Sequence, residues 1–376
     1  MRITRLILSN FRNYAAQQCV FNSGRALFTG KNGQGKTNLL EAIYLCFALK
    51  SFRTSDFRRL IMDGSAACSV SAEIEYGGLP HTLSIQRSRT EYTCMLDGKN
   101  LKNKKSYIRM GMPVVLSNAD ILISTGPPAL RREFFDFTLS LISEKYYSAL
   151  MSYKKQMKQR NAELKAGRSP LHWNGGLARS GTILINARLS FLRALKPFLR
   201  EAHSRLQGTD TPEADIVYTI FPPRGCAELN IISKVKKRAE QISEQEYLDL
   251  LEKSKLADSI IKTTGFGAHR DDFSFFLDTK NIIHYASQGQ CRIFIYAVKL
   301  AVSSFLEKSL KKQSVLIVDD IFADLDEEKI KNFFSFTGDH SQMFLACANG
   351  QLLPKGLAGF TEYRISGGII QESTYA

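Results

Sequence analysis

The pattern of apolar and polar residues predicts two strands and a helix at the start of the chain. Residues 2–9 alternate between the two kinds, and residues 24–30 include the run Leu27-Phe28-Thr29; both patterns are typical of strands. After Lys36, apolar residues recur at helical spacing, at Leu39, Leu40, Ile43, Tyr44 and Phe47. Residues 30–37 are therefore expected to form a turn from a strand into a helix.

The rest of the chain divides into regions of different character. Short strands are predicted at residues 68–76, 81–87 and 91–96, and helical periodicity then dominates from residue 121 to 255. Beyond residue 256, the apolar runs 315–318 and 342–346 are typical of buried parallel strands. We predict an α/β head formed by both chain ends, residues 1–120 and 256–376, with an inserted, mainly helical lobe at residues 121–255.

The predicted strand-to-helix turn carries a phosphate-binding motif. It reads Gly30-Lys31-Asn32-Gly33-Gln34-Gly35-Lys36-Thr37 and matches GxxxxGKT in full. In this motif, backbone N–H groups and a helix N-terminus converge on the phosphates of ATP. Lys36 would reach the β and γ phosphates, and Thr37 would bind Mg²⁺. A dinucleotide-binding turn is excluded, because the sequence from Gly33 ends in Asn38 where a glycine or alanine is required.

The second half of a P-loop site follows the apolar run 315–318. Asp319 ends this predicted strand and is the candidate to orient Mg²⁺. Asp320 comes next and is placed to polarise an attacking water or accept its proton. About 280 residues separate Lys36 from Asp319, which requires an insertion between the two halves.

Charge adds a candidate partner to this picture. The 376 residues include 51 Lys and Arg against 36 Asp and Glu, a net charge of +15, which favours nucleic acid or an anionic membrane surface. Residues 131–200 hold 14 basic and 4 acidic residues. This excess marks either a solvated face or a DNA-binding one. The DNA candidates are the basic residues of one helical region, Arg131, Arg132, Lys154, Lys155, Lys158 and Arg160.

Cysteine spacing and hydropathy suggest a reducing compartment. The seven cysteines contain no CxxC pair, so neither a zinc site nor a disulfide framework is predicted. No segment approaches the roughly 18 apolar residues of a membrane span, and the N-terminal apolar run is too short for a signal peptide. We expect a cytoplasmic protein without a membrane partner.

Two further strings resemble motifs of ATP-binding-cassette (ABC) ATPases. Ser287-Gln288-Gly289-Gln290 precedes an apolar helical stretch and resembles their signature motif, and residues 323–326 resemble their D-loop. In that superfamily the signature of one subunit closes over the ATP held by another. The resemblance implies an ATP-dependent homodimer in which Ser287 completes the neighbour's site.

The chain resembles the RecF family of bacterial DNA replication and repair proteins nearly from end to end. The residues that carry the resemblance are the strings at 10–14, 30–45, 51–54, 126–128, 131–136, 158–161, 269–272 and 286–290, together with Tyr153. It implies an ABC-type head, slow DNA-stimulated ATP hydrolysis, and binding to single-stranded and duplex DNA at gaps or junctions. It also implies work with RecR to help RecA displace single-strand-binding protein, and a phosphate contact from Arg12.

The sequence departs from the family pattern at several positions, and the roles of some residues therefore stay undecided. Ala268 stands where the family has proline, and residues 117–120 stand near a Pro-Glu-Asp string of the family. Where ABC ATPases often carry a switch histidine, this chain has Ala346-Cys347-Ala348. His340 lies too early in the sequence to take that role. His269 and Arg270 are either a nucleotide-facing pair or structural residues. Alternative functions are the motor subunit of a membrane transporter or a long-armed chromosome-organising ATPase.

Overall fold

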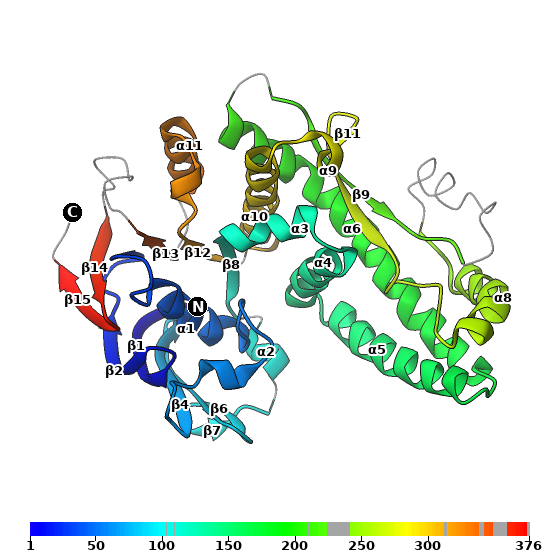
Figure 1. The fold of residues 1–376 in the computed structure, drawn as a ribbon, viewed down its shortest axis with the longest axis horizontal. Helices are drawn as coiled ribbons and strands as arrows, with labels where there is room; N and C mark the ends of the chain where they lie inside the picture. The colour runs from blue at the N-terminus through cyan, green and yellow to red at the C-terminus, as the bar shows by residue number, and fades with distance from the viewer. Residues whose placement is uncertain are drawn as a thin grey trace. The chain divides into compact units, whose positions relative to one another are not determined.

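The computed structural model describes residues 1–102, 104–108, 110–208, 211–223, 241–311, 314–337, 342–348 and 359–373. By its internal contacts the chain divides into two units (Figure 1). The first comprises residues 1–120, 201–211 and 292–376, and the second comprises residues 121–200 and 212–291. Both chain ends therefore contribute to the first unit.

One sheet of the first unit is mostly parallel. Its strand order is β15-β14-β3-β13-β12-β8, and only β15 runs antiparallel to its neighbour. Its strands are β3 (Arg25–Thr29), β8 (Met112–Ser117), β12 (Ser314–Asp319), β13 (Gln342–Cys347), β14 (Phe360–Ser366) and β15 (Ile369–Ser373). Every residue of β13 is buried, as is every residue of β12 except Asp319, which explains why these two predicted strands are continuous apolar runs.

The other sheet of this unit is antiparallel, in the order β2-β1-β4-β5-β6-β7. Its strands are β1 (Arg2–Phe11), β2 (Tyr14–Val20), β4 (Ala67–Tyr76), β5 (Leu79–Ser88), β6 (Tyr92–Leu96) and β7 (Lys99–Asn100). The Gln342 side chain connects the two sheets, because its Oε1 accepts from Ile3 N at 3.0 Å and its Nε2 donates to Ile3 O at 2.7 Å.

Helix α1 (Lys36–Ala48) contacts strands of both sheets. Its residues from Leu39 to Ala48 are all buried, so the helix is enclosed on every side. The other helices of this unit are α2 (Lys104–Ile108), α11 (Glu327–Thr337) and most of α10 (Gln288–Leu310), with short 3₁₀ turns η1 (Phe57–Leu60), η2 (Asn118–Asp120) and η4 (Phe322–Asp324).

The second unit is mainly helical. It contains α3 (Ile121–Thr125), α4 (Pro128–Ile142), α5 (Glu144–Lys165), η3 (Leu171–Trp173), most of α6 (Asn174–Gln207), α8 (Glu244–Ile261) and α9 (Ile282–Tyr285). The periodicity of residues 130–165 is divided between two helices at Ser143, which ends α4 and caps α5 by accepting a hydrogen bond from Tyr146 N. A serine favours such a boundary because its side chain satisfies a terminal N–H group.

The second unit differs from the predicted lobe in two places, because residues 201–211 belong to the first unit and because the far boundary lies later in the chain. We predicted a return to the head at residue 256, whereas the second unit extends to Cys291. The reason is a three-stranded sheet, in which β10 (Asp272–Leu277) pairs with both β9 (Ala214–Thr219) and β11 (Lys280–Asn281). Pairing between strands far apart in sequence leaves no local pattern, so it was not predicted.

Candidate nucleotide-binding site

The loop from β3 to α1 adopts a backbone that requires glycine. Gly30, Gly33 and Gly35 have φ angles of 146°, 79° and 119°, which L residues with side chains rarely adopt. A Cβ atom at Gly30 would lie 2.2 Å from Ile365 O. Lys31, Asn32 and Gly33 are exposed at the tip of the loop. This is the backbone on which a P-loop depends.

Lys36 and Thr37 begin α1. The Lys36 side chain contacts the loop, and the Thr37 side chain contacts the end of β12. Lys36 Nζ donates to Gly30 O at 2.6 Å and to Lys31 O at 3.0 Å, so its ammonium lies inside the loop. Thr37 Oγ1 donates to Asp319 Oδ1 at 2.8 Å. The predicted Thr37 and Asp319 pair is therefore in contact across about 280 residues of sequence.

The oxygen atoms of this pair suit Mg²⁺. A hydroxyl and a carboxylate are hard oxygen ligands of the kind that Mg²⁺ prefers. Burial raises the pKa of Asp319, and neighbouring Asp320 raises it further, while the hydroxyl of Thr37 opposes this shift. A cation at these oxygens would offset the cost of a buried carboxylate, so the residues fit the metal that the motif implies.

Asp320 lies directly after β12 in a left-handed conformation, with a φ angle of 53°. Its N–H donates to Ala346 O at 3.1 Å, and its Oδ1 accepts from Ala348 N at 3.1 Å. Ala346 and Ala348 lie at the end of β13, in the string that occupies the place of a switch histidine. His340 lies outside the residues that the structure describes. The Asp320 carboxylate is thus oriented by backbone groups of the neighbouring strand end.

Polar residues to which the sequence assigned no role, Asn13, Tyr14 and Asn38, hold the loop in a hydrogen-bond network. Asn13 Nδ2 donates to Gln34 O at 3.0 Å, and Asn38 Nδ2 donates to Asn13 Oδ1 at 2.8 Å. Tyr14 OH donates to Gly35 O at 3.0 Å. Gln34 Oε1 also accepts from Gly367 N at 2.6 Å. These side-chain contacts add to the backbone hydrogen bonds that the same carbonyls accept, from Gly368 N to Gln34 O at 3.2 Å and from Leu39 N to Gly35 O at 2.9 Å.

Arg12 binds a buried carboxylate of α1. Its Nε and Nη2 each donate to Glu41 at 2.8 Å, and the Glu41 side chain has an exposed fraction of 0%. Ser51 Oγ also donates to Glu41, and Arg53 Nη1 lies 3.5 Å from it. The predicted contact of Arg12 with phosphate remains a prediction, because the contact seen is this ion pair.

Ser287 belongs to the second unit and lies at the start of α10. Its Oγ accepts from Gln290 N at 3.2 Å, while its own N–H donates to Gln290 Oε1 at 2.8 Å. This reciprocal arrangement is a capping box. Ser287, Gln288, Gly289 and Gln290 are all exposed. The string that resembles an ABC signature thus forms an accessible helix start.

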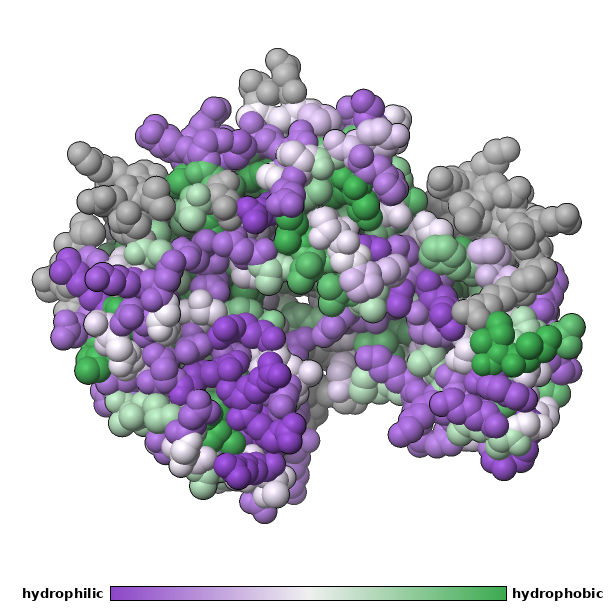
Figure 2. All heavy atoms as spheres, viewed as in Figure 1, coloured by the Kyte–Doolittle hydropathy of each residue, from purple (hydrophilic) through white to green (hydrophobic). Residues whose placement is uncertain are grey.

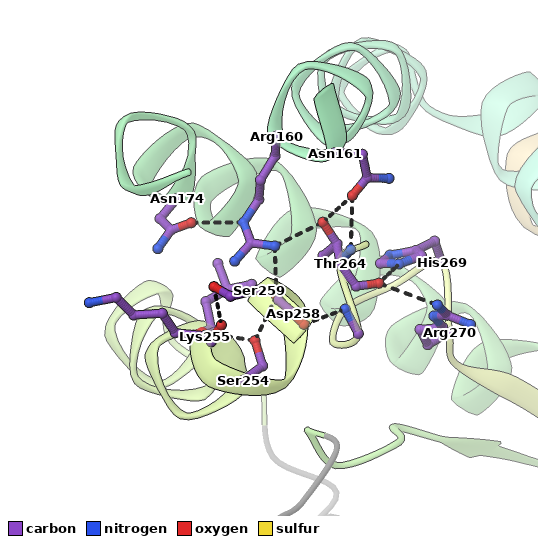
Figure 3. Close-up of polar contacts among 12 residues, drawn as sticks. Arg160, Asn161, Asn174, Ser254, Lys255, Asp258, Ser259, Thr264, His269 and Arg270 are labelled. Carbon is purple, nitrogen blue, oxygen red and sulfur yellow. Dashed lines mark hydrogen bonds and ion pairs between the residues drawn. The ribbon is translucent and has the colours of Figure 1, made fainter. Parts of the chain in front are cut away.

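Two of the six DNA candidates are wrong, because they are buried in the second unit. Arg160 has an exposed fraction of 0% and its Nη1 donates to Asp258 Oδ2 at 2.7 Å (Figure 3). Arg131 makes a bidentate pair with Asp272, at 2.7 and 2.9 Å. A buried arginine is retained only with a hydrogen-bonded partner. These arginines connect elements of the second unit and cannot reach a DNA phosphate.

The His269 ring is also held inside the second unit. Its Nε2 lies 3.1 Å from Thr264 O (Figure 3). Its Nδ1 lies 2.7 Å from Tyr153 OH. Burial lowers the pKa of His269 to about 4, which favours a neutral ring donating through Nε2 and accepting at Nδ1. Of the two interpretations left open for this residue, the geometry favours the structural one.

Helix α5 of the second unit carries exposed lysines, and helix α8 carries exposed apolar residues. Three of the lysines on α5, Lys154, Lys155 and Lys158, are exposed and are hereafter called the α5 lysines. Near the end of α8, Leu256 and Ile260 are 76% and 71% exposed, and apolar side chains gather over that helix in Figure 2. The α5 lysines are therefore accessible, as the DNA hypothesis requires.

Comparison with known proteins shows the family to which this chain belongs. The family profile described as RecF/RecN/SMC N terminal domain matches residues 2–360. The DNA replication and repair protein RecF of Ruminiclostridium cellulolyticum is 32% identical, with the alignment covering 98% of this chain and 99% of the relative. The chain belongs to the RecF family. RecF of Thermosynechococcus vestitus is 30% identical, over 92% of this chain and 90% of that protein.

Solved structures support the same assignment. A structure of the recombination mediator protein RecF-ATPrS in the RecFOR pathway matches with a TM-score of 0.84 and 25% identity, covering 98% of this chain and 97% of that one. A structure of the Smc head bound to a domain of ScpA has a TM-score of 0.56 at 14% identity, over 100% of this chain and 98% of that one, which shows similarity of fold alone. The predicted ABC-type α/β head and the predicted RecF resemblance are confirmed.

Proposed function

We propose that this RecF-family chain binds and slowly hydrolyses ATP with Mg²⁺, and that ATP controls its dimerisation and its binding of DNA in recombinational repair and replication. The observation that carries this proposal is the hydrogen bond of 2.8 Å between Thr37 and Asp319. It brings the phosphate-binding loop and the acidic strand end together. A match to the P-loop motif alone would not require that contact.

The residues of the first unit have distinct roles in this proposal. Backbone N–H groups of residues 30–35 and the N-terminus of α1 bind the phosphates, and the Lys36 ammonium neutralises charge on the β and γ phosphates. Thr37 and Asp319 would hold Mg²⁺, which neutralises charge developing on the phosphate oxygens. Asp320 would orient the attacking water and accept its proton.

Dimerisation is proposed because the signature string is accessible. Ser287 is exposed and held in place by a capping box, so a second copy could approach it without unfolding α10. In this arrangement Ser287 of one copy would complete the ATP site of the other. Relatives that support the assignment are RecF proteins, including one described with the nucleotide analogue ATPrS.

DNA binding is proposed for the second unit. The α5 lysines are exposed, and ammonium groups that neutralise phosphates release counterions without reading base sequence. Single-stranded and duplex DNA at gaps or junctions is the substrate that the family resemblance implies. RecR, RecA and single-strand-binding protein are the corresponding protein partners, and the cytoplasm is the corresponding compartment.

The exposed end of α8 supplies a candidate surface for a protein partner such as RecR. Leu256 and Ile260 are large apolar residues with most of their area exposed, and apolar residues of this kind are common at the centre of interfaces. Changing both to serine should weaken capture of purified RecR. Unchanged capture by the variant would exclude this surface.

A Lys36→Ala variant tests the proposal as a whole. We expect at least tenfold weaker ATP binding, since charged hydrogen bonds of this kind contribute about 1.5–3 kcal/mol, and loss of ATP-dependent dimers in sedimentation. Lys99→Ala, which removes an exposed lysine from β7, is the matched control and should behave as wild type. Normal ATP-dependent dimerisation of Lys36→Ala would contradict the proposal.

A transporter motor is the alternative from another class. In the part of the chain that the structure describes, no helix is long and apolar enough to cross a bilayer. That finding does not exclude a separate membrane subunit, so an assay must decide. Stimulation of ATP hydrolysis by gapped DNA would favour the RecF-type function, and the absence of any effect of DNA would favour the alternative.

A further inference from the structure

A short turn after β8 connects Asp320 to α10. Within this turn, η2 (Asn118–Asp120), Asn118 Nδ2 donates to Asp320 O at 3.1 Å. The Oδ1 of the same side chain accepts from Tyr296 OH, on α10, at 3.3 Å. One exposed amide therefore bridges the proposed catalytic acid and a helix. All three residues belong to the first unit.

The turn is fixed to α10 at a second point. Lys299 Nζ lies 2.5 Å from Asp120 Oδ1 and donates to Val115 O at 2.7 Å. Asp120 Oδ2 in turn accepts from Ser117 N at 2.7 Å. Tyr296 and Lys299 are three residues apart, so they lie on one face of α10. The position of Asn118 is therefore determined by the helix.

Asp320 has a backbone that needs such support. Its φ angle of 53° is uncommon for a residue with a Cβ atom. Its N–H and its Oδ1 are bonded to Ala346 and Ala348, at the end of β13. Asn118 donates to the carbonyl oxygen of the same residue. Without this third contact, rotation of the peptide after Asp320 would be less restricted.

We propose that Asn118 is a positioning residue for the Asp320 carboxylate, and that Tyr296 of α10 holds Asn118 in place. This inference rests on the proposed ATPase function. It assigns to α10 a direct influence on hydrolysis within its own chain. Asn118 touches the reacting groups only through Asp320, so it should affect the rate of hydrolysis and leave ATP binding unchanged.

The test compares Asn118→Ala, Tyr296→Phe and the double variant in the full-length protein with ATP. Asn118 is exposed, so its truncation leaves the core intact. Asn118→Ala should lower kcat about fivefold, because losing one hydrogen bond of about 1 kcal/mol changes a rate by that factor. The KM and the Kd for ATP should stay within about twofold of wild type. Tyr296→Phe should lower kcat by a smaller factor.

The double variant distinguishes a connected pair from two independent residues. If Tyr296 acts through Asn118, the double variant should have the kcat of Asn118→Ala alone, because interacting residues are not additive. Tyr363→Phe is the matched control. It removes a hydroxyl that donates to Val20 O at 2.6 Å in the same unit, and its kcat should equal that of wild type.

Each contrary outcome overturns the inference in a distinguishable way. A weakened Kd with unchanged kcat in Asn118→Ala would mean that Asn118 contacts the nucleotide directly. Unchanged kcat and Kd would mean that the bridge has no role in hydrolysis. Additive losses of kcat in the double variant would mean that Tyr296 does not act through Asn118. A wild-type protein that binds no ATP would refute the proposed function itself.

Discussion

Removing the Arg12 side chain tests the ion pair behind the phosphate-binding loop. Glu41 is fully buried and receives two hydrogen bonds of 2.8 Å from Arg12. Arg12→Ala leaves this carboxylate buried without its bidentate partner, and breaking a buried pair costs about 3–5 kcal/mol. Ser51 and Arg53 remain near Glu41 and compensate in part. We therefore expect a loss of about 3 kcal/mol in the free energy of unfolding.

Urea unfolding, followed by far-UV circular dichroism, measures this loss. The double variant Arg12→Ala/Glu41→Gln should recover part of it, because the buried charge is then gone. Arg58→Ala is the control, since Arg58 pairs with Asp56 at the surface, and its midpoint should not change. The reasoning is refuted if Arg12→Ala is as stable as wild type, or if the double variant is less stable than Arg12→Ala.

The same variants separate stability from nucleotide contact. If Arg12 only holds Glu41, the double variant should recover ATP affinity along with stability. If Arg12 also contacts a phosphate, stability should recover while ATP affinity stays low. Isothermal titration with ATP distinguishes these outcomes.

Three further predictions concern DNA, pH and the loop backbone. Changing the α5 lysines to glutamine should weaken binding to duplex DNA. The slope of the logarithm of the binding constant against the logarithm of salt concentration should fall by about 0.9 for each lysine that neutralises a phosphate. Fluorescence anisotropy measures this slope, and an unchanged slope would exclude the α5 lysines as phosphate contacts. Burial lowers the pKa of His203 to about 4, so this residue binds fewer protons in the folded state than in the unfolded state. Between about pH 6.5 and pH 4, His203 alone should therefore lower the free energy of unfolding, by about 2 kcal/mol at pH 5. In His203→Gln, thermal melts should show a smaller fall of stability over that range. Gly30→Ala should abolish ATP binding, because its Cβ atom would meet Ile365 O, whereas Gly64→Ala, at another positive φ but with open space around it, should leave ATP affinity unchanged.

Local patterns were sufficient to predict the parts of the site that lie on one segment. The glycines of residues 30–35 and the helix after Lys36 predicted the loop, because both depend on neighbours in sequence. The apolar run before Asp319 predicted a buried parallel strand for the same reason. That Thr37 and Asp319 should meet followed from the motif pair, since P-loop sites require both halves.

Contacts between distant segments were beyond sequence reasoning. Arg160 looked like a surface residue among lysines, and only the fold places Asp258 of α8 beside it. The strand β9 pairs with β10, more than 50 residues later. Asn118 carried no signal of its own, because its partners Asp320 and Tyr296 come from elements far along the chain. The identity of such partners depends on tertiary packing.

Mixing two inactive variants tests most directly whether a second copy completes the ATP site. Lys36→Ala lacks a working loop, and Ser287→Arg lacks a working signature, so neither alone should hydrolyse ATP. In a heterodimer of the two, the intact loop of one chain would face the intact signature of the other. We predict that the mixture, with DNA present, regains hydrolysis above that of either variant alone. A mixture no more active than its two components would contradict the account.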